Sequence, residues 1–80
     1  MDKQLEKFLK DFGRRVKEQR ELKKFTLEDM DFHTGIDASD FNKIEQGKTN
    51  ITFRTFLKVC KGLNLPPKVL LDFKIDLDKE

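Results

Sequence analysis

The segment TLEDMDFHTGIDASDFNKIEQG, residues 26–47, carries the signals of two short helices joined by a tight turn. Thr26 has the short hydroxyl side chain that caps a helix start. Glu28 and Asp29 follow in the first turn, where the helix dipole favours negative charge. Together these residues predict a helix over 27–33.

A turn and a second helix follow directly. Gly35 can adopt the left-handed backbone conformation that ends a helix tightly, and the short carboxylate of Asp37 is typical of a helix cap. The second helix is predicted over 38–46, and Gly47 lies at the usual position after its end. Two apolar side chains of this helix are expected to face the core: Phe41 and Ile44.

Three further helices are predicted around this pair. Apolar residues at steps of three and four indicate an amphipathic helix that ends near Lys23: Leu5, Phe8, Leu9, Phe12 and Val16. Gly13 is a mild weak point in this helix. Thr52 is predicted to cap a helix with the same spacing at Phe53, Phe56, Leu57, Cys60 and Leu63. Pro66 and Pro67 fit the first turn of a short last helix that runs through residue 71.

The C-terminal segment FKIDLD, residues 73–78, changes to the period-two spacing of a half-buried strand. The sequence contains no second strand-like segment, so such a strand needs a partner from another chain. Pairing across a two-fold axis would supply that partner and make a dimer. This interpretation assigns dimerisation to Phe73, Ile75 and Leu77. The alternative is a frayed terminus in which Phe73 alone packs on the core, and the sequence leaves both open.

Length and composition predict a single all-α domain of five helices over residues 1–80, with 36% hydrophobic residues and eight Phe to build a small core. The core is expected over 12–71, the central helix pair over 27–46 and a C-terminal tail over 72–80. The sequence has no run of eighteen apolar residues and no signal-peptide pattern, so we expect a cytoplasmic protein. The single Cys60 cannot form an internal disulfide, which agrees with a reducing compartment.

The net charge of +2 is divided sharply along the chain. Residues 1–25 hold nine basic and five acidic side chains, and residues 26–46 hold one basic and six acidic ones. Residues 47–70 hold five basic side chains and no acidic one, and the last ten residues hold two basic and four acidic. Two basic regions therefore flank an acidic centre. By itself this pattern is more often a solvated surface than a nucleic-acid site.

The order of the helices, together with several spaced motifs, resembles the lambda-repressor and Cro-like class of helix-turn-helix regulators, which serve bacteria and phages. The resemblance spans about residues 12–71. Its motifs are RRVKEQR in the first helix, TLEDM opening the second, TGI at the turn, KIEQGKTN closing the third and TFLKVCKGLNL in the fourth. The size is also similar to that of restriction-modification controller proteins. The resemblance implies a homodimeric transcriptional repressor or controller, without a cofactor, that binds a palindromic double-stranded DNA operator.

In this class the third helix enters the major groove and the second crosses the DNA backbone. The resemblance assigns base reading to the exposed positions of the helix over 38–46, which are Ala38, Ser39, Asn42 and Lys43. Asn can bond adenine through two atoms, Lys can donate to guanine, Ser is adaptable, and Ala allows close approach to a thymine methyl group. Without the family pattern, the same residues would be interpreted as a solvated helix face.

The resemblance also implies phosphate contacts and one structural ion pair. The expected phosphate contacts are Thr26, Gln46, Lys48, Thr49, Asn50 and Arg54, with further positive charge from Arg14, Arg15, Lys17 and Lys24. Because bound phosphates release counterions, affinity is expected to fall steeply as salt rises. Arg20 and Glu45 are expected to form a salt bridge that ties the first helix to the end of the third. The competing interpretation makes Arg20 a free phosphate contact.

Several residues depart from the family pattern. Leu27 replaces a Gln that touches a phosphate in many relatives, Asp31 replaces a small Ala between the two helices, and Thr34 replaces the usual Leu. Phe32 is expected to take over part of the buried surface beside Asp31. The carboxylate of Asp40 lies near the expected DNA backbone, and three roles stay open: stabilising the helix start, accepting a hydrogen bond from a cytosine amine, or repelling non-specific DNA.

Other function classes have less support in the sequence. We expect no enzyme, because His33 is the only histidine and Cys60 falls in an apolar helix face. We expect no metal site, because neither paired Cys or His ligands nor a calcium-loop spacing is present. The alternative function is a protein-interaction or antitoxin-like module whose acidic residues meet a basic partner: Asp31, Asp37 and Asp40.

Overall fold

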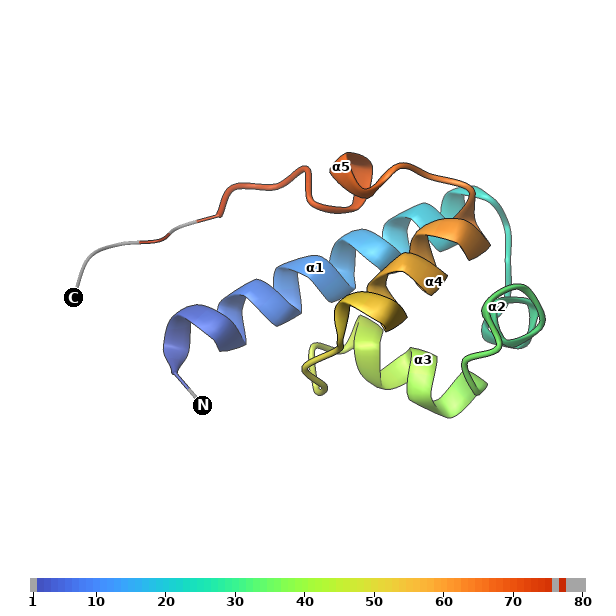
Figure 1. The fold of residues 1–80 in the computed structure, drawn as a ribbon, viewed down its shortest axis with the longest axis horizontal. Helices are drawn as coiled ribbons and strands as arrows, with labels where there is room; N and C mark the ends of the chain where they lie inside the picture. Colours follow the sequence, from blue (N-terminus) through green and yellow to red (C-terminus); the bar gives the residue numbers. More distant parts are fainter. Residues whose placement is uncertain (1, 76, 78–80) are drawn as a thin grey trace.

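The computed structural model describes residues 2–75 and 77, and these residues form five helices (Figure 1). The helices are α1 (Lys3–Leu22), α2 (Leu27–Thr34), α3 (Ala38–Glu45), α4 (Phe53–Leu63) and α5 (Pro67–Leu70). The predicted all-α fold class is therefore confirmed, with helix ends within about two residues of those expected. Within the described residues, none of the helices combines the length and apolar character needed to cross a membrane.

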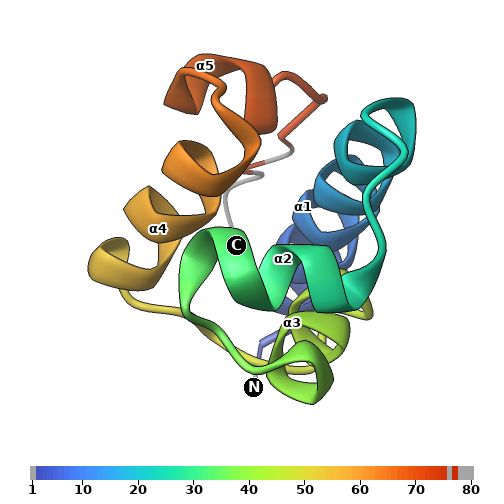
Figure 2. The ribbon, with the colours of Figure 1, turned by 90° about the vertical axis from the view of Figure 1, so that its right-hand side faces the viewer.

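The long helix α1 is the support on which the other helices are assembled. α3 and α5 pack on different sides of it (Figure 1), and α4 packs against α2 and α5. α2 contacts both α3 and α4, which closes the other end of the core (Figure 2). All five helices contribute to one apolar core: Phe12, Val16, Met30, Phe41, Ile44, Val59, Leu63 and Leu70. This core fixes the position of α2 and α3 relative to each other.

The backbones of α1 and α3 approach each other closely at Gly13. Gly13 is buried, and a Cβ atom at this position would overlap the backbone carbonyl oxygens of Ile44 and Glu45. The sequence marked Gly13 only as a weak point of its helix. The structure shows that Gly13, which has no side chain, leaves the space that the backbone at the end of α3 occupies.

Three apolar residues that were expected in buried surfaces are exposed. Phe53 and Leu57 of α4 are 86% and 56% exposed, whereas Val59 and Leu63 of the same helix are buried. The expectation for Phe32 is wrong, because its side chain is 85% exposed. Met30 is the buried residue of α2, and a residue two positions further along a helix points to a nearly opposite side.

The C-terminal tail contains no strand within residues 73–75 and 77, the part that the structure describes. Phe73 packs against Phe8 with ring centroids 5.5 Å apart, as the frayed-terminus alternative requires. Ile75 and Leu77 are exposed. Asp76 and Asp78 of the expected strand lie outside the described residues, and the dimerisation role of Phe73, Ile75 and Leu77 stays a prediction.

Candidate nucleic-acid interface

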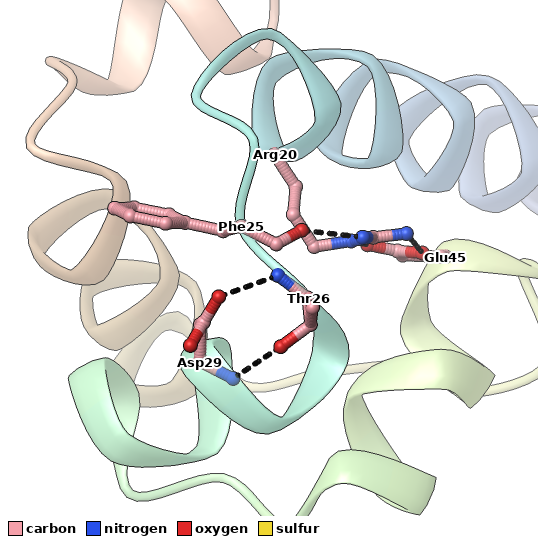
Figure 3. A network of polar contacts seen from close by, with 5 residues as sticks. All are labelled: Arg20, Phe25, Thr26, Asp29 and Glu45. Atoms are coloured by element: carbon pink, nitrogen blue, oxygen red, sulfur yellow. Dashed lines mark hydrogen bonds and ion pairs between the residues drawn. The ribbon is translucent and has the colours of Figure 1, made fainter.

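The start of α2 is held by a reciprocal cap (Figure 3). The Thr26 hydroxyl accepts a hydrogen bond from the backbone N–H of Asp29 at 3.0 Å, and the Asp29 carboxylate accepts one from the backbone N–H of Thr26 at 2.7 Å. The hydrogen bond from the Thr26 backbone N–H is the largest cause of a lowered pKa at Asp29, and the interaction with the Thr26 hydroxyl is the second. Thr26 is an expected phosphate contact and is exposed. Its hydroxyl oxygen already accepts a hydrogen bond within the cap.

Asp29→Asn is expected to flatten the loss of stability on acidification. Because the folded state lowers the pKa of Asp29, its carboxylate adds stability above the ordinary pKa, and this contribution disappears as pH falls through the lowered value. Thermal unfolding followed at pH values between about 2 and 6 measures this dependence. Equal steepness in the variant and the parent protein would contradict the role given to this carboxylate.

Gly35 and Thr34 build the turn between α2 and α3. Gly35 has a φ of 76°, in the left-handed region, and its N–H donates to the carbonyl of Asp31 at 2.8 Å. The Thr34 hydroxyl donates to the carbonyl of Met30 at 2.6 Å and accepts from the N–H of Ile36 at 2.9 Å. The resembled class usually has Leu at the position of Thr34. The two hydrogen bonds of the Thr34 hydroxyl stabilise the turn and explain this departure.

The start of α3 differs from the expected cap. Asp37 occupies the cap position, but its side chain accepts no backbone hydrogen bond from the helix. It accepts instead from the hydroxyl of Ser39 at 3.0 Å. Because a hydroxyl has one donor hydrogen and two lone pairs, Ser39 in this state offers a ligand only acceptor capacity. The predicted side-chain cap is therefore wrong, and the carboxylate orients a base-reading candidate.

The four base-reading candidates lie on the α3 surface that does not enter the core. Phe41 and Ile44 are buried, Ser39 and Lys43 are exposed, and Ala38 and Asn42 are half-buried. This arrangement matches the helical periodicity of the sequence. The buried pair fixes the rotation of α3, so that one polar face is presented outward.

A groove of about 580 Å³ runs between α3 and the segment that leads into α4. Asp40 and Lys43 line one wall, and the other carries polar side chains at and before the start of α4: Thr49, Asn50, Thr52 and Thr55. The Thr52 hydroxyl accepts from the N–H of Thr55 at 3.1 Å and caps α4. Among the described residues, no ion pair holds Asp40. The groove brings one reading candidate, Lys43, together with two phosphate candidates, Thr49 and Asn50, whereas Ala38, Ser39 and Asn42 do not line it.

The remaining phosphate candidates do not line this groove. Thr26, Gln46, Lys48 and Arg54 are exposed, and they come from the start of α2, the loop after α3 and the first turn of α4. Gly47 lies within this loop with a φ of 72°, and a Cβ atom added there would overlap the α1 backbone at Lys10. The loop that carries Gln46 and Lys48 is therefore anchored on α1.

Arg20 of α1 and Glu45 at the end of α3 form an ion pair (Figure 3). Arg20 Nε donates to Glu45 Oε2 at 2.6 Å, and Nη2 donates to Oε1 at 3.1 Å. A third donor, Nη1, bonds the carbonyl of Phe25 at 2.8 Å. The two side chains are only 11% and 3% exposed, and the hydrogen bond with Glu45 raises the pKa of Arg20. Arg20 thus links α1, the start of α2 and the end of α3, which argues against a free phosphate contact.

Two of the basic residues of α1 also have structural partners. Arg15 Nε donates to the carbonyl of Val69 at 2.8 Å and so holds α5, while Arg14 lies 3.4 Å from the carboxylate of Asp11. Lys17 and Lys24 are exposed. The expected contribution of α1 to phosphate binding is therefore weakened at Arg15, whose guanidinium faces away from α3, towards α5.

Of the two residues considered for chemistry, Cys60 is buried and His33 is exposed beside two aromatic rings. Cys60 is buried in α4, and burial raises the pKa of its thiol, which disfavours a reactive thiolate. The ring of His33 lies 4.7 Å from that of Phe25 and 5.4 Å from that of Phe32. In the described part of the chain, no group of three His, Cys, Asp or Glu side chains could hold a metal ion.

Comparisons with known proteins agree with this architecture. A family described as a helix-turn-helix domain matches residues 13–74. The crystal structure of the restriction-modification controller protein C.AhdI from Aeromonas hydrophila is similar, with a TM-score of 0.75 and 32% sequence identity over 78% of this chain and 94% of that chain. A search of curated proteins gives no match. The chain belongs to the helix-turn-helix domain family and has the build of a small helix-turn-helix transcriptional regulator.

Proposed function

We propose that this protein is a sequence-specific regulator that binds a palindromic double-stranded DNA operator as a homodimer, with α3 in the major groove. The observation that carries the proposal is the outward polar face of α3 beside a groove whose opposite wall is polar and free of acidic residues. The likeness to a restriction-modification controller favours a repressor or controller role. Operator binding also agrees with the expected cytoplasmic location, and the buried position of Cys60 favours binding over catalysis.

Base reading is assigned to Ala38, Ser39, Asn42 and Lys43. Ser39 would accept from an exocyclic amine of adenine or cytosine, because its own hydrogen is donated to Asp37. Asn42 suits adenine and Lys43 suits guanine. Each good bidentate contact between a side chain and a base is worth about 1 to 3 kcal/mol of discrimination.

Phosphate binding is assigned to Thr26, Gln46, Lys48, Thr49, Asn50 and Arg54. The capped start of α4 faces the groove beside Thr49 and Asn50, so the positive end of its dipole adds to the attraction for a phosphate. In a dimer, two such surfaces would engage half-sites about one helical turn apart.

The most direct test selects bound duplexes from a random pool and then titrates the best duplex with salt. The proposal expects a palindromic consensus and an affinity that falls steeply as salt rises. Absence of duplex binding at low salt, in protein that is folded by circular dichroism, would refute the proposal.

Lys48→Ala and Arg54→Ala are each expected to reduce the slope of log affinity against log salt by about one, because each removes a phosphate contact. The loss should be nearly the same for operator and random duplexes. Lys68→Ala is the matched control, because Lys68 is exposed on α5, away from α3 (Figure 1). Fluorescence anisotropy at several salt concentrations measures the slopes, and equal slopes in all three variants would remove these residues from the phosphate set.

Asp40→Asn is expected to raise the affinity for random duplexes at low salt. Asp40 is exposed, lies in the groove beside Lys43 and has no ion pair within the described chain, so its charge would face a bound phosphate backbone. A gain of several-fold is consistent with removal of one repulsive charge near the surface. Unchanged or weaker binding in anisotropy would argue against repulsion and leave the cytosine contact or the helix dipole as its role.

A protein-interaction module is the second candidate, and one observation favours it. Phe32 is 85% exposed beside the exposed Asp31, and an exposed aromatic residue next to acidic ones suits a partner surface. This candidate would replace the first if duplex binding is absent and a basic partner protein loses affinity for the Phe32→Ala variant.

A further inference from the structure

A second groove lies between the first half of α1 and the start of α4. Its volume is about 290 Å³, and most of its lining is apolar: Leu5, Phe8, Leu9, Phe12, Phe53 and Phe56. The four α1 residues in this set precede residue 13, where the family match begins. The groove is therefore partly built by a helical extension outside the matched helix-turn-helix region.

Apolar side chains around this groove lack cover. Phe53 is 86% exposed at its edge, and Leu57 follows one turn later on α4 at 56%. Ile75 and Leu77 of the tail are 41% and 75% exposed. The tail leaves the body near the N-terminal end of α1 (Figure 1), where Phe8 lines both the groove and the shallow depression beside the tail.

The tail of the same chain lies against a different face of α1. Ile75 and Leu77 share their depression with Gln4, Lys7 and Asp11, none of which lines the groove. The described part of the tail therefore leaves the groove of its own chain open.

The charges of the two surfaces are complementary. The exposed polar residues of α4 near Phe53 and Leu57 are basic, Arg54, Lys58 and Lys61, and residues 47–70 contain no acidic side chain. The tail over 72–80 has four acidic and two basic residues, and its acidic residues alternate with apolar ones over 75–78. An apolar and acidic segment is the occupant that an apolar and basic surface favours.

We infer that the groove of each protomer receives the C-terminal tail of a second copy, so that two protomers exchange tails across a two-fold axis. The inference rests on the homodimer of the proposed function and names its interface. Ile75 and Leu77 cover Phe53 and Leu57, and the acidic residues of the tail approach Lys58 and Lys61. Each protomer supplies one groove and one tail, as an isologous interface requires.

The first test measures dimer dissociation by sedimentation over a dilution series. Removal of residues 75–80, which keeps Phe73, is expected to raise the dimer Kd at least about tenfold because two tails lose apolar burial. Lys58→Glu with Lys61→Glu should weaken the dimer, and adding Asp76→Lys with Asp78→Lys should restore it. Lys17→Glu, at an exposed site of α1, is the control. An unchanged Kd after truncation would overturn the inference.

The second test identifies which chain supplies the tail. In a Cys60→Ala background, a Leu57→Cys chain is mixed with a tagged Leu77→Cys chain under mild oxidation. A disulfide between the unlike chains is the expected product. Exclusive links between two Leu77→Cys chains would instead support strand pairing of the tails. A monomeric link within a chain that carries both substitutions would show that the tail fills its own groove, and either result would overturn the exchange.

Duplex binding separates this inference from the proposed function. If the full chain forms tail-linked dimers but binds no duplex, the proposed function fails and the interface stands. If truncation leaves both the dimer and operator affinity unchanged, the tail exchange fails and the regulator function stands.

Discussion

Replacing Arg20 with alanine is expected to lower the free energy of unfolding by about 3 to 5 kcal/mol, because the change strands a buried carboxylate. Glu45 is 3% exposed and would lose both of its bonds to Arg20, and the carbonyl of Phe25 would lose its donor. A domain of this size is stabilised by about 4 to 12 kcal/mol in total, so the loss is a large fraction. Urea or thermal unfolding of the variant measures it.

Two variants show whether the effect comes from the buried ion pair. Arg14→Ala removes an exposed ion pair with Asp11 and should cost at most about 1 kcal/mol. Arg20→Met combined with Glu45→Met should recover much of the loss, since an apolar pair leaves no buried charge. If Arg20→Ala unfolds like the parent protein but binds DNA more weakly, Arg20 is a phosphate contact and the structural role is wrong.

The local features of the fold could be predicted from the sequence because their causes are local. Thr26 and Thr52 cap their helices through bonds to residues three positions away, and Gly35 ends α2 in the left-handed conformation. The apolar periodicity of α3 placed Phe41 and Ile44 in the core. These signals lie within a few residues of the structure that they determine.

The errors concern packing between elements that are distant in sequence. Periodicity placed Phe53 and Leu57 on the apolar face of α4, but α2 and α5, which pack against this helix, leave both residues exposed. Phe32 was assigned to the core from its neighbour Asp31, although the rotation of α2 is set by Met30 and its contacts with α3 and α4. The local sequence pattern predicts that a helix has an apolar face, but it does not predict how much of that face other helices will cover.

The candidate site shows the same division. Helical periodicity predicted which α3 residues face outward, and resemblance to a known class predicted the pair of Arg20 and Glu45 that the structure contains. The hydrogen bond from Ser39 to Asp37 could not be predicted, because a short carboxylate at this position can accept from either the backbone or a nearby hydroxyl. The bond from Arg15 to Val69 depends on the docking of α5 and was also missed.

Gly13→Ala is expected to destabilise the protein, although Ala is the better helix former by about 1 kcal/mol. The added Cβ would overlap the backbone carbonyl oxygens of Ile44 and Glu45, and overpacking of this kind typically costs about 1 to 3 kcal/mol and occasionally more. Backbone atoms cannot rotate away as a side chain can, and Arg20 holds the end of α3 in place. We therefore expect a net loss of up to about 2 kcal/mol in chemical unfolding, since the overpacking cost exceeds the gain in helix propensity.

Two other glycines provide matched controls for this effect. A Cβ at Gly35 meets no atom within 4 Å, so Gly35→Ala should cost only the strain of its positive φ, about 1 to 2 kcal/mol. A Cβ added at Gly62 would overlap the methyl group of Thr34. Because the Thr34 hydroxyl forms hydrogen bonds at both ends of the turn, Gly62→Ala should disturb the turn before α3. Stabilisation by Gly13→Ala would mean that helix propensity outweighs the contact and that α1 and α3 can separate. Because the same displacement would move the outward face of α3, a destabilised but folded Gly13→Ala variant should also lose operator affinity, which anisotropy well below its unfolding temperature measures.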